Sequence, residues 1–197
     1  MKKSTIIAVI LVLLASTSSF AGFAIGGNIG IGGSNMSGYD PSSNEPDETS
    51  MALSYQFGLE AQYSIIPLIG LKFNVNYIRF AGSAKNSGYS EFDNDFRYLD
   101  IDVAINLSIA KFSIYAGGFL AFNLSATVAE TEYDEYTNGT VAGLLIGLAY
   151  NMGLGPIKLP IGVEFKYILS GMLDDDKVSV NHKAWALHFK VGILFGI

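Results

Sequence analysis

Cysteine is absent from the 197-residue chain, which excludes a disulfide framework and a thiolate metal site. Charged residues make up only 15%, and the 12 basic residues are outnumbered by 18 acidic ones, so the basic surface that nucleic-acid binding needs is missing. No run of about 20 apolar residues is present, which excludes a membrane-spanning helix. Half of the residues are nevertheless apolar and the mean hydropathy is +0.34, which is apolar for a soluble domain.

The N-terminal residues 1–21 have the pattern of a secretory signal peptide. Two lysines follow Met1, residues 6–15 are mainly apolar, and Ser19, Phe20 and Ala21 form a cleavage site with small residues. A retained anchor helix is the alternative, but this stretch falls well short of the about 20 apolar residues that span a bilayer. We therefore expect residues 1–21 to be removed and residues 22–197 to form one barrel domain.

Residues 51–65 show a strict alternation of apolar and polar or small side chains. Leu53, Tyr55 and Phe57 are separated by Ser54 and Gln56. A period of two indicates a β-strand, because successive side chains leave opposite faces of a sheet. The same period recurs in residues 23–31, 69–77, 99–107, 112–124, 142–150, 157–169 and 185–197. The sequence thus predicts an all-β fold of eight antiparallel up-and-down strands, each of about 9 to 14 residues, longer than usual.

The expected connections alternate between short and long. Short links lie near 66–68, 109–110 and 151–156, and long polar links cover 33–50, 82–95, 127–139 and 171–183. Short turns at one end and long loops at the other are typical of an outer-membrane barrel. The long links carry 14 of the 18 acidic residues.

Alternation alone does not separate a membrane barrel from a soluble one with an apolar interior. Here the polar face is rich in small residues and sparse in charge, which suits the narrow interior of an eight-stranded barrel better than a hydrated surface. Its charges balance, as an enclosed space requires. The predicted lumen charge network comprises Glu60, Asp100, Asp102 and Glu164, with Lys72, Lys158, Lys166, Lys190 and His188. Glu60 and Lys72 are expected to stand opposite each other as an ion pair.

Aromatic residues on the apolar face gather toward the strand ends, where membrane barrels carry interfacial girdles. The predicted girdle consists of Tyr63, Phe112, Tyr150 and Phe195 at one end, and Tyr77, Tyr167 and Trp185 at the other.

The C-terminal segment KVGILFGI resembles the assembly signal of bacterial outer-membrane barrels. Lys190, Gly192 and Phe195 match that signal, whereas Ile197 stands where an aromatic residue is usual. Together with eight strands, this makes the chain similar to the OmpA/OmpX-like family of small outer-membrane β-barrel proteins. The resemblance implies a transmembrane β-barrel in the cell outer membrane of a Gram-negative envelope. It also implies outer-membrane lipid and the barrel-assembly machinery as partners, and a monomer.

Two motifs suggest enzymatic or ligand chemistry but lack essential parts. GGNIGIGG (26–33) has neither a P-loop lysine nor a following helix, so we interpret its glycines as lining a narrow barrel. Outer-membrane lipid A deacylases resemble the expected fold and carry a His-x-Ser pair, but neither His182 nor His188 is followed by that serine. We expect no catalytic residue, cofactor or metal site. The acidic loops lack an EF-hand register, and divalent-cation binding by them stays open.

The leading functional hypothesis is a non-catalytic surface protein with a side-chain-filled lumen. Its four acidic loops would serve adhesion, surface protection or envelope integrity and meet an external ligand. Two alternatives are a narrow porin-like channel and a lipid-modifying outer-membrane enzyme.

Overall fold

The structure is a computed structural model that describes residues 22–39, 48–85, 92–128, 131–132, 137–172 and 181–196. The predicted signal peptide, residues 1–21, lies outside the described residues, as does Ile197. Within the described ranges, no helix is long and apolar enough to cross a membrane.

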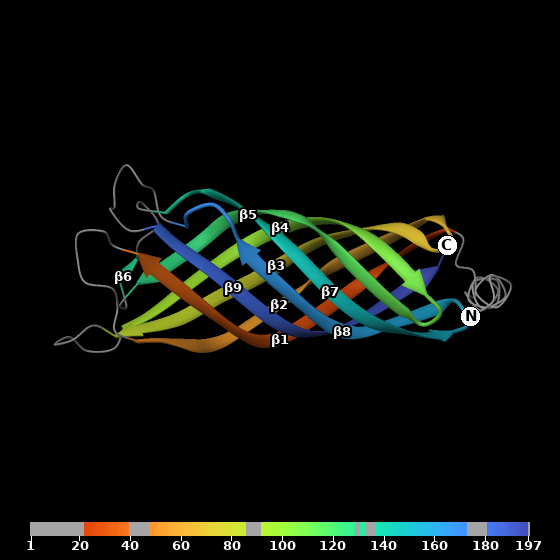
Figure 1. Ribbon diagram of the computed structural model, residues 1–197, viewed down its shortest axis with the longest axis horizontal. Helices are drawn as coiled ribbons and strands as arrows, with labels where there is room; N and C mark the ends of the chain where they lie inside the picture. The colour runs from red at the N-terminus through yellow and green to blue at the C-terminus, as the bar shows by residue number, and fades with distance from the viewer. Residues whose placement is uncertain are drawn as a thin grey trace, which may run out of the picture.

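Eight long antiparallel strands form a closed barrel, which confirms the predicted fold (Figure 1). Each strand pairs with its neighbour along the chain, and β1 pairs with β9 to close the ring. The strands are β1 (Phe23–Tyr39), β2 (Glu48–Ile66), β3 (Ile69–Lys85), β4 (Phe92–Ile109), β5 (Phe112–Val128), β7 (Thr140–Leu154), β8 (Ile157–Ile168) and β9 (Asn181–Gly196). The two-residue β6 (Thr131–Glu132) pairs with the end of β5 inside the link between β5 and β7.

The predicted strand lengths of 9 to 14 residues are wrong for most strands, which run from 12 to 19 residues. Their ladders continue into segments that we expected to be loops, such as 33–39 in β1 and 82–85 in β3. The reason is that the apolar stripe marks only the part of a strand that faces lipid, whereas ladder hydrogen bonds are made by the backbone and continue beyond it. The long links are therefore shorter than predicted.

The three short links are tight turns at Pro67–Leu68, Ala110–Lys111 and Gly155–Pro156. Ala110 and Gly155 have positive φ, of 55° and 66°, which tight hairpin turns favour. Residues 22 and 196 lie at the same end as these turns, opposite the long links (Figure 1). Short turns and long links therefore separate to the two ends of the barrel, as the sequence predicted.

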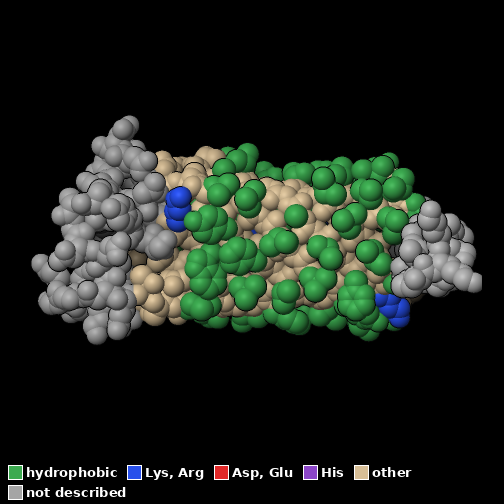
Figure 2. Space-filling model, viewed as in Figure 1, with side chains coloured by type: hydrophobic (Ala, Val, Ile, Leu, Met, Phe, Trp, Pro, Cys, Tyr) green, Lys and Arg blue, Asp and Glu red, His purple; other side chains and the backbone are tan. Residues whose placement is uncertain are grey.

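The two faces of each strand differ as the alternation predicted. On β2, Leu53 and Leu59 are 55% and 65% exposed, whereas Gln56 and Glu60 are 0% and 1% exposed. Apolar side chains cover the outer wall along most of its length (Figure 2). An outer wall of this kind fits hydrocarbon, where a closed barrel leaves no backbone group unpaired. The chain is a transmembrane β-barrel.

Gly26, Gly30 and Gly32 lie on the inner face of β1, as we predicted for the GGNIGIGG segment, whereas Gly27 and Gly33 lie on the outward face with Ile25, Ile29 and Ile31. A Cβ atom on Gly32 would lie 1.8 Å from the backbone oxygen of Leu187 on β9. A Cβ atom on Gly30 would lie 2.9 Å from Cγ of Gln56 on β2. Neighbouring strands thus occupy the space that a side chain on β1 would need.

We predict that Gly32→Ala destabilises the barrel by about 1–3 kcal/mol or more, because the added methyl group overpacks a site bounded by backbone. Urea titration of the refolded protein, followed by heat-modifiable migration on SDS gels, measures the effect. Gly153→Ala is the matched control, since nothing lies within 4 Å of its Cβ position. Equal midpoints for the two variants would contradict the close approach at Gly32.

Candidate functional site

The nine residues of the predicted lumen charge network all project from the inner faces of the strands. Eight of them are at most 5% exposed, and Lys158, near the short-turn end, is half-buried. They come from β2, β3, β4, β8 and β9, so residues far apart in sequence meet across the lumen. Two centres can be distinguished, one around Lys166 and one around Glu60.

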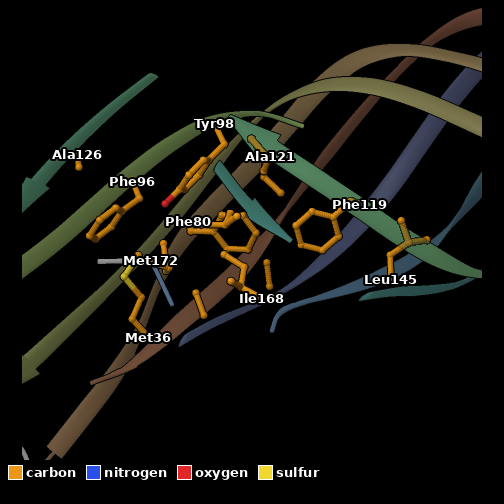
Figure 3. Close-up of a cluster of buried hydrophobic side chains, with 14 of the residues drawn as sticks. Met36, Phe80, Phe96, Tyr98, Phe119, Ala121, Ala126, Leu145, Ile168 and Met172 are labelled. Carbon is orange, nitrogen blue, oxygen red and sulfur yellow. The ribbon is translucent and has the colours of Figure 1, made fainter. Parts of the chain in front are cut away.

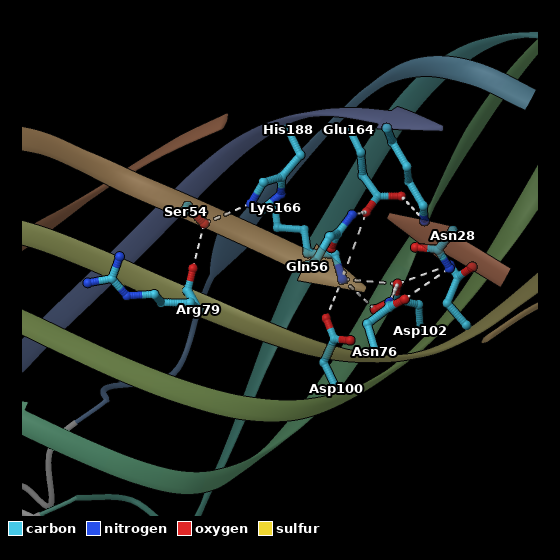
Figure 4. Close-up of polar contacts among 12 residues, drawn as sticks. Asn28, Ser54, Gln56, Asn76, Arg79, Asp100, Asp102, Glu164, Lys166 and His188 are labelled. Carbon is cyan, nitrogen blue, oxygen red and sulfur yellow. Dashed lines mark hydrogen bonds and ion pairs between the residues drawn. The ribbon is translucent and has the colours of Figure 1, made fainter. Parts of the chain in front are cut away.

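Lys166 of β8 is the cation of the first centre. It forms ion pairs with Asp100 and with Asp102, whose Oδ1 lies 3.0 Å from Nζ (Figure 4). Asn74 and Asn76 donate hydrogen bonds to Oδ2 of Asp102, at 3.0 and 3.2 Å. Two adjacent carboxylates of β4 are thus held by one lysine and two amides.

The second centre links Glu60 and Glu164 through lysines. Lys72 lies 2.9 Å from Glu60, and Lys190 lies 3.6 Å from Glu60 and 3.2 Å from Glu164. Tyr115 donates a hydrogen bond to Glu164 at 3.0 Å, and its ring lies 4.2 Å below the Lys72 ammonium group. A longer contact of 3.9 Å between Glu164 and Lys166 joins the two centres. Gln62 connects Lys158 to Glu60 through hydrogen bonds on its two amide atoms.

The predicted ion pair between Glu60 and Lys72 forms, but its predicted register is wrong. Glu60 stands opposite Asn74, and Lys72 stands opposite Gln62. The pairing shifts between Ser64 and Ile66, beside the Pro67 turn, which moves the hairpin centre away from Ile66. The two charged residues are therefore diagonal neighbours, a separation that long side chains can bridge.

His188 and Ser54 meet across β1, where Gly32 leaves room between them. His188 Nε2 lies 2.7 Å from Ser54 Oγ, and the Ser54 hydroxyl donates to the backbone oxygen of Arg79 (Figure 4). Because the hydroxyl proton is used in that bond, the imidazole donates to the serine rather than accepting from it. The arrangement lacks the proton acceptor that would activate a nucleophile. The side chain of His182 lies outside what the structure describes.

An apolar cluster packs inside the barrel (Figure 3), with some members beside the charge network and others nearer the long links. Its members are buried and come from nearly every strand. Apart from Tyr115 of the second centre, the larger ones are Met36, Ile78, Phe80, Phe96, Tyr98, Phe119, Leu145, Ile168 and Met172. We call these residues the lumen plug.

The sequence analysis missed the lumen plug, although a signal was present. Phe80 lies on the inward face of β3, in line with the polar residues Asn74 and Asn76. Phe96 and Tyr98 lie on the inward face of β4, in line with Asp100 and Asp102. Aromatic residues at inward positions next to a loop indicate that the barrel interior closes there. The apolar stripe alone does not reveal this, because it describes the outer wall.

A cavity of about 10 Å³ lies beside the second centre, lined by Glu60, Lys72, Tyr115 and Lys190 among others. This volume suits about one water molecule. Oε2 of Glu60 is buried there without a hydrogen-bond donor. Pro160 and Gly192 also line the cavity. The pairing between β8 and β9 is interrupted at these two residues, because proline has no N–H to donate to the neighbouring strand.

The predicted girdle residues lie on the outer wall in two groups. Near the short turns, Tyr63, Phe112, Tyr150 and Phe195 are 37–54% exposed, and the Phe112 and Tyr150 rings contact edge to face at 5.3 Å. Nearer the long links, Tyr77, Tyr167 and Trp185 are partly exposed, and Tyr167 pairs with Trp185 across strands. Tyr55, which the prediction omitted, is stacked beside Tyr77 at 6.2 Å.

The residues of the predicted assembly signal lie on both faces of β9. Lys190 and Gly192 face inward, and Phe195 faces outward with 48% exposure. Most of the acidic loop side chains lie outside the described residues, except Asp95 at the outer end of β4. No group of three His, Cys, Asp or Glu side chains that could hold a metal ion occurs in the described parts of the chain.

No protein family model matches the chain, and no curated protein does either. Among solved structures, it is similar to Neisserial surface protein A, with 17% identity over 89% of this chain and 97% of that chain and a TM-score of 0.50. It also matches the outer membrane protein OprG of Pseudomonas aeruginosa, with 13% identity, coverage of 89% and 93%, and a TM-score of 0.49. A third match is Ail of Yersinia pestis, with 18% identity, coverage of 88% and 99%, and a TM-score of 0.45.

At these identities the likeness concerns the fold. With its lipid-facing outer wall, the chain has the architecture of the small OmpA/OmpX-like barrels, and its place is the outer membrane.

We predict that Lys72→Met lowers the free energy of unfolding by about 3–5 kcal/mol, because the 3.6 Å contact with Lys190 is then the one ion pair left to Glu60 among the described residues, beside its hydrogen bond from Gln62. Adding Glu60→Leu should restore much of the loss, since it removes the uncompensated carboxylate. Urea titration of the refolded barrel measures both variants. Lys111→Met, at an exposed turn, serves as the control. Strictly additive effects would mean that Glu60 and Lys72 do not interact.

Proposed function

We propose that this protein is a non-catalytic outer-membrane surface protein, whose rigid barrel holds four acidic extracellular connections for binding an external ligand. Adhesion, surface protection and envelope integrity are the roles that such an arrangement serves. The observation that carries the proposal is the filled lumen. The lumen plug and the charge network together occupy the interior, which leaves the outer ends of the strands as the place for function.

The charge of the long links supports a cationic ligand. Within their predicted bounds they contain 14 acidic residues against Lys85, Lys177 and Lys183, and of these 14 Asp95 is paired with Arg79 and Arg97. The lumen charges add no net charge, because the four carboxylates inside the barrel are balanced by four lysines. The acidic excess therefore belongs to the long-link end of the barrel, where it attracts cations and repels anions.

The geometry of Ser54 and His188 supports a role without catalysis. Both side chains are 0% exposed, and the serine hydroxyl is committed to the backbone oxygen of Arg79. A lipid-modifying enzyme would need its nucleophile within reach of a lipid substrate on the outer wall or at a loop.

We predict that cells displaying the full chain bind a fluorescent oligolysine peptide more strongly than cells displaying a barrel whose segments 40–47, 86–91, 129–136 and 173–180 are replaced by short Gly-Ser turns. Heparin, an anionic probe, should bind neither form. A third variant with the Asp and Glu residues of these segments changed to Asn and Gln keeps the loop lengths and separates charge from shape. Heat-modifiable migration verifies that all forms fold. Equal oligolysine binding by the full and trimmed chains would contradict the proposal.

A narrow channel is the alternative, and the cavity beside Glu60 and the nearby gap at Pro160 favour it. The lumen plug opposes it, because large apolar side chains block the route toward the long links. Planar-bilayer recording separates the two functions. We expect no steady openings from the full-length barrel, and small ones from a variant with Phe80→Ala and Phe96→Ala. Steady nanosiemens conductance of the unaltered protein would support the channel.

A further inference from the structure

Five residues form a charged aromatic group on the outer wall of β2, β3 and β4, near the long links. They are Tyr55, Tyr77, Arg79, Asp95 and Arg97, and we call them the outer arginine site. Arg79 pairs directly with Arg97 across β3 and β4, and with Tyr55 across β2 and β3. All five occupy outward positions, on the same face as the lipid-facing Leu99 and Phe57.

The two guanidinium groups converge on one carboxylate. Asp95 Oδ2 accepts hydrogen bonds from Arg79 Nε at 3.0 Å and from Arg97 Nη2 at 3.2 Å. Arg79 also donates from Nη1 to the backbone oxygen of Leu53 at 2.9 Å. Two cations against one anion leave a net positive charge. The Arg97 side chain is 46% exposed, and within the described parts of the chain its printed hydrogen bond goes to Asp95, so other N–H groups of its guanidinium face outward.

The depth of the site matches a lipid headgroup rather than hydrocarbon. Arg79 and Arg97 are each two residues beyond Tyr77 and Leu99, which is about 7 Å along a strand. Tyr55 and Tyr77 are stacked at 6.2 Å, and the Arg79 guanidinium lies 5.9 Å from the centre of the Tyr55 ring. Tyrosines of this kind occupy the membrane–water interface, and an arginine on the lipid face of a barrel is tolerated at that depth but costly at the midplane.

The opposite end of the barrel provides a comparison. Lys111 is an exposed cation at a short turn, 5.9 Å from the centre of the Tyr150 ring. Lysine acts as a single point charge, whereas two arginines offer planar forks that match phosphate oxygens in pairs. The two ends thus present different cation chemistry to their two leaflets.

We propose that the outer arginine site binds a phosphate group of an anionic phosphorylated lipid in the leaflet at the long-link end. Arg97 and the outer edge of Arg79 donate to the phosphate oxygens, and the tyrosine rings lie against the sugar or glycerol part of the headgroup. Asp95 orients the two guanidinium groups side by side. The inference rests on the proposed membrane orientation, with the long links outside, but not on what the loops bind.

The test uses the full-length barrel refolded in detergent, with bisphosphorylated lipid A as the probe and native mass spectrometry as the measurement of bound lipid. Arg79→Gln with Arg97→Gln should lower the affinity about tenfold, the size expected for charge-assisted hydrogen bonds. Raised salt should weaken binding to the unaltered barrel more than to this variant. Lys111→Gln is the matched control and should bind lipid A like the unaltered barrel.

Asp95→Asn distinguishes phosphate binding from a merely structural role of the arginines. It removes the competing negative charge and should strengthen lipid A binding several-fold. The asparagine oxygen can still accept from both guanidinium groups, so weaker lipid A binding by this variant would contradict the proposal. If the double arginine variant fails to fold, the test uses Arg97→Gln alone, because this change leaves the Arg79 contacts with Asp95 and with the backbone oxygen of Leu53 in place.

The final comparison measures binding of lipid A from which the phosphates have been removed. Loss of binding on dephosphorylation, in step with loss on arginine substitution, supports the site. Equal binding of both lipids, or binding that the arginine variants leave unchanged, overturns it. Inorganic phosphate alone should not compete at millimolar concentration, and competition would assign the site to a free anion. None of these outcomes depends on oligolysine binding, so this inference and the proposed loop function can fail separately.

Discussion

Closure of the sheet is the constraint on which the rest of the structure depends. In hydrocarbon, each backbone N–H and C=O must be paired, and pairing of β1 with β9 removes the last open edge. Closing only eight strands makes the interior so narrow that side chains fill it. The outer wall is then free to be uniformly apolar, because lipid imposes no requirement beyond hydrophobicity. The side chains of the inner face must fit the narrow lumen and balance one another's charges, so the choice of residue is most restricted there.

The narrow interior explains why glycine and charge occur together in this chain. Gly30 and Gly32 on β1 have no side chain, so side chains of β2 reach across them to β8 and β9. Gln56 thereby reaches Glu164, and Ser54 reaches His188. An enclosed charge must find its partner within a few ångströms, since little water is present to screen it. Balanced charges and small residues on neighbouring strands are thus two results of the same lack of space.

The alternation of side chains was sufficient to predict the barrel, its strand number and the inward position of every charged network residue. Period two is a local property, and it survives in the fold because one face meets lipid and the other does not. The register of the Pro67 hairpin could not be predicted, because a shift at Ser64 depends on turn geometry rather than on polarity. The ends of the strands were also missed, since backbone pairing continues where the apolar stripe stops. Arg79 and Asp95 were not recognised as partners because this required the register between β3 and β4.

The division of the lumen into a charged part and an apolar part has a mechanical consequence. On β4 the inward residues change from Asp102 and Asp100 to Tyr98 and Phe96 within one strand. The lumen plug therefore shields the Lys166 centre from water at the long-link end, and shielding strengthens the ion pairs that it covers. Those ion pairs in turn join β4 to β8 across the lumen, which resists flattening of the barrel. A wall braced in this way holds the outer ends of the strands at fixed separations. Fixed separations are what a binding surface assembled from several loops, or from side chains on three adjacent strands, requires of its support.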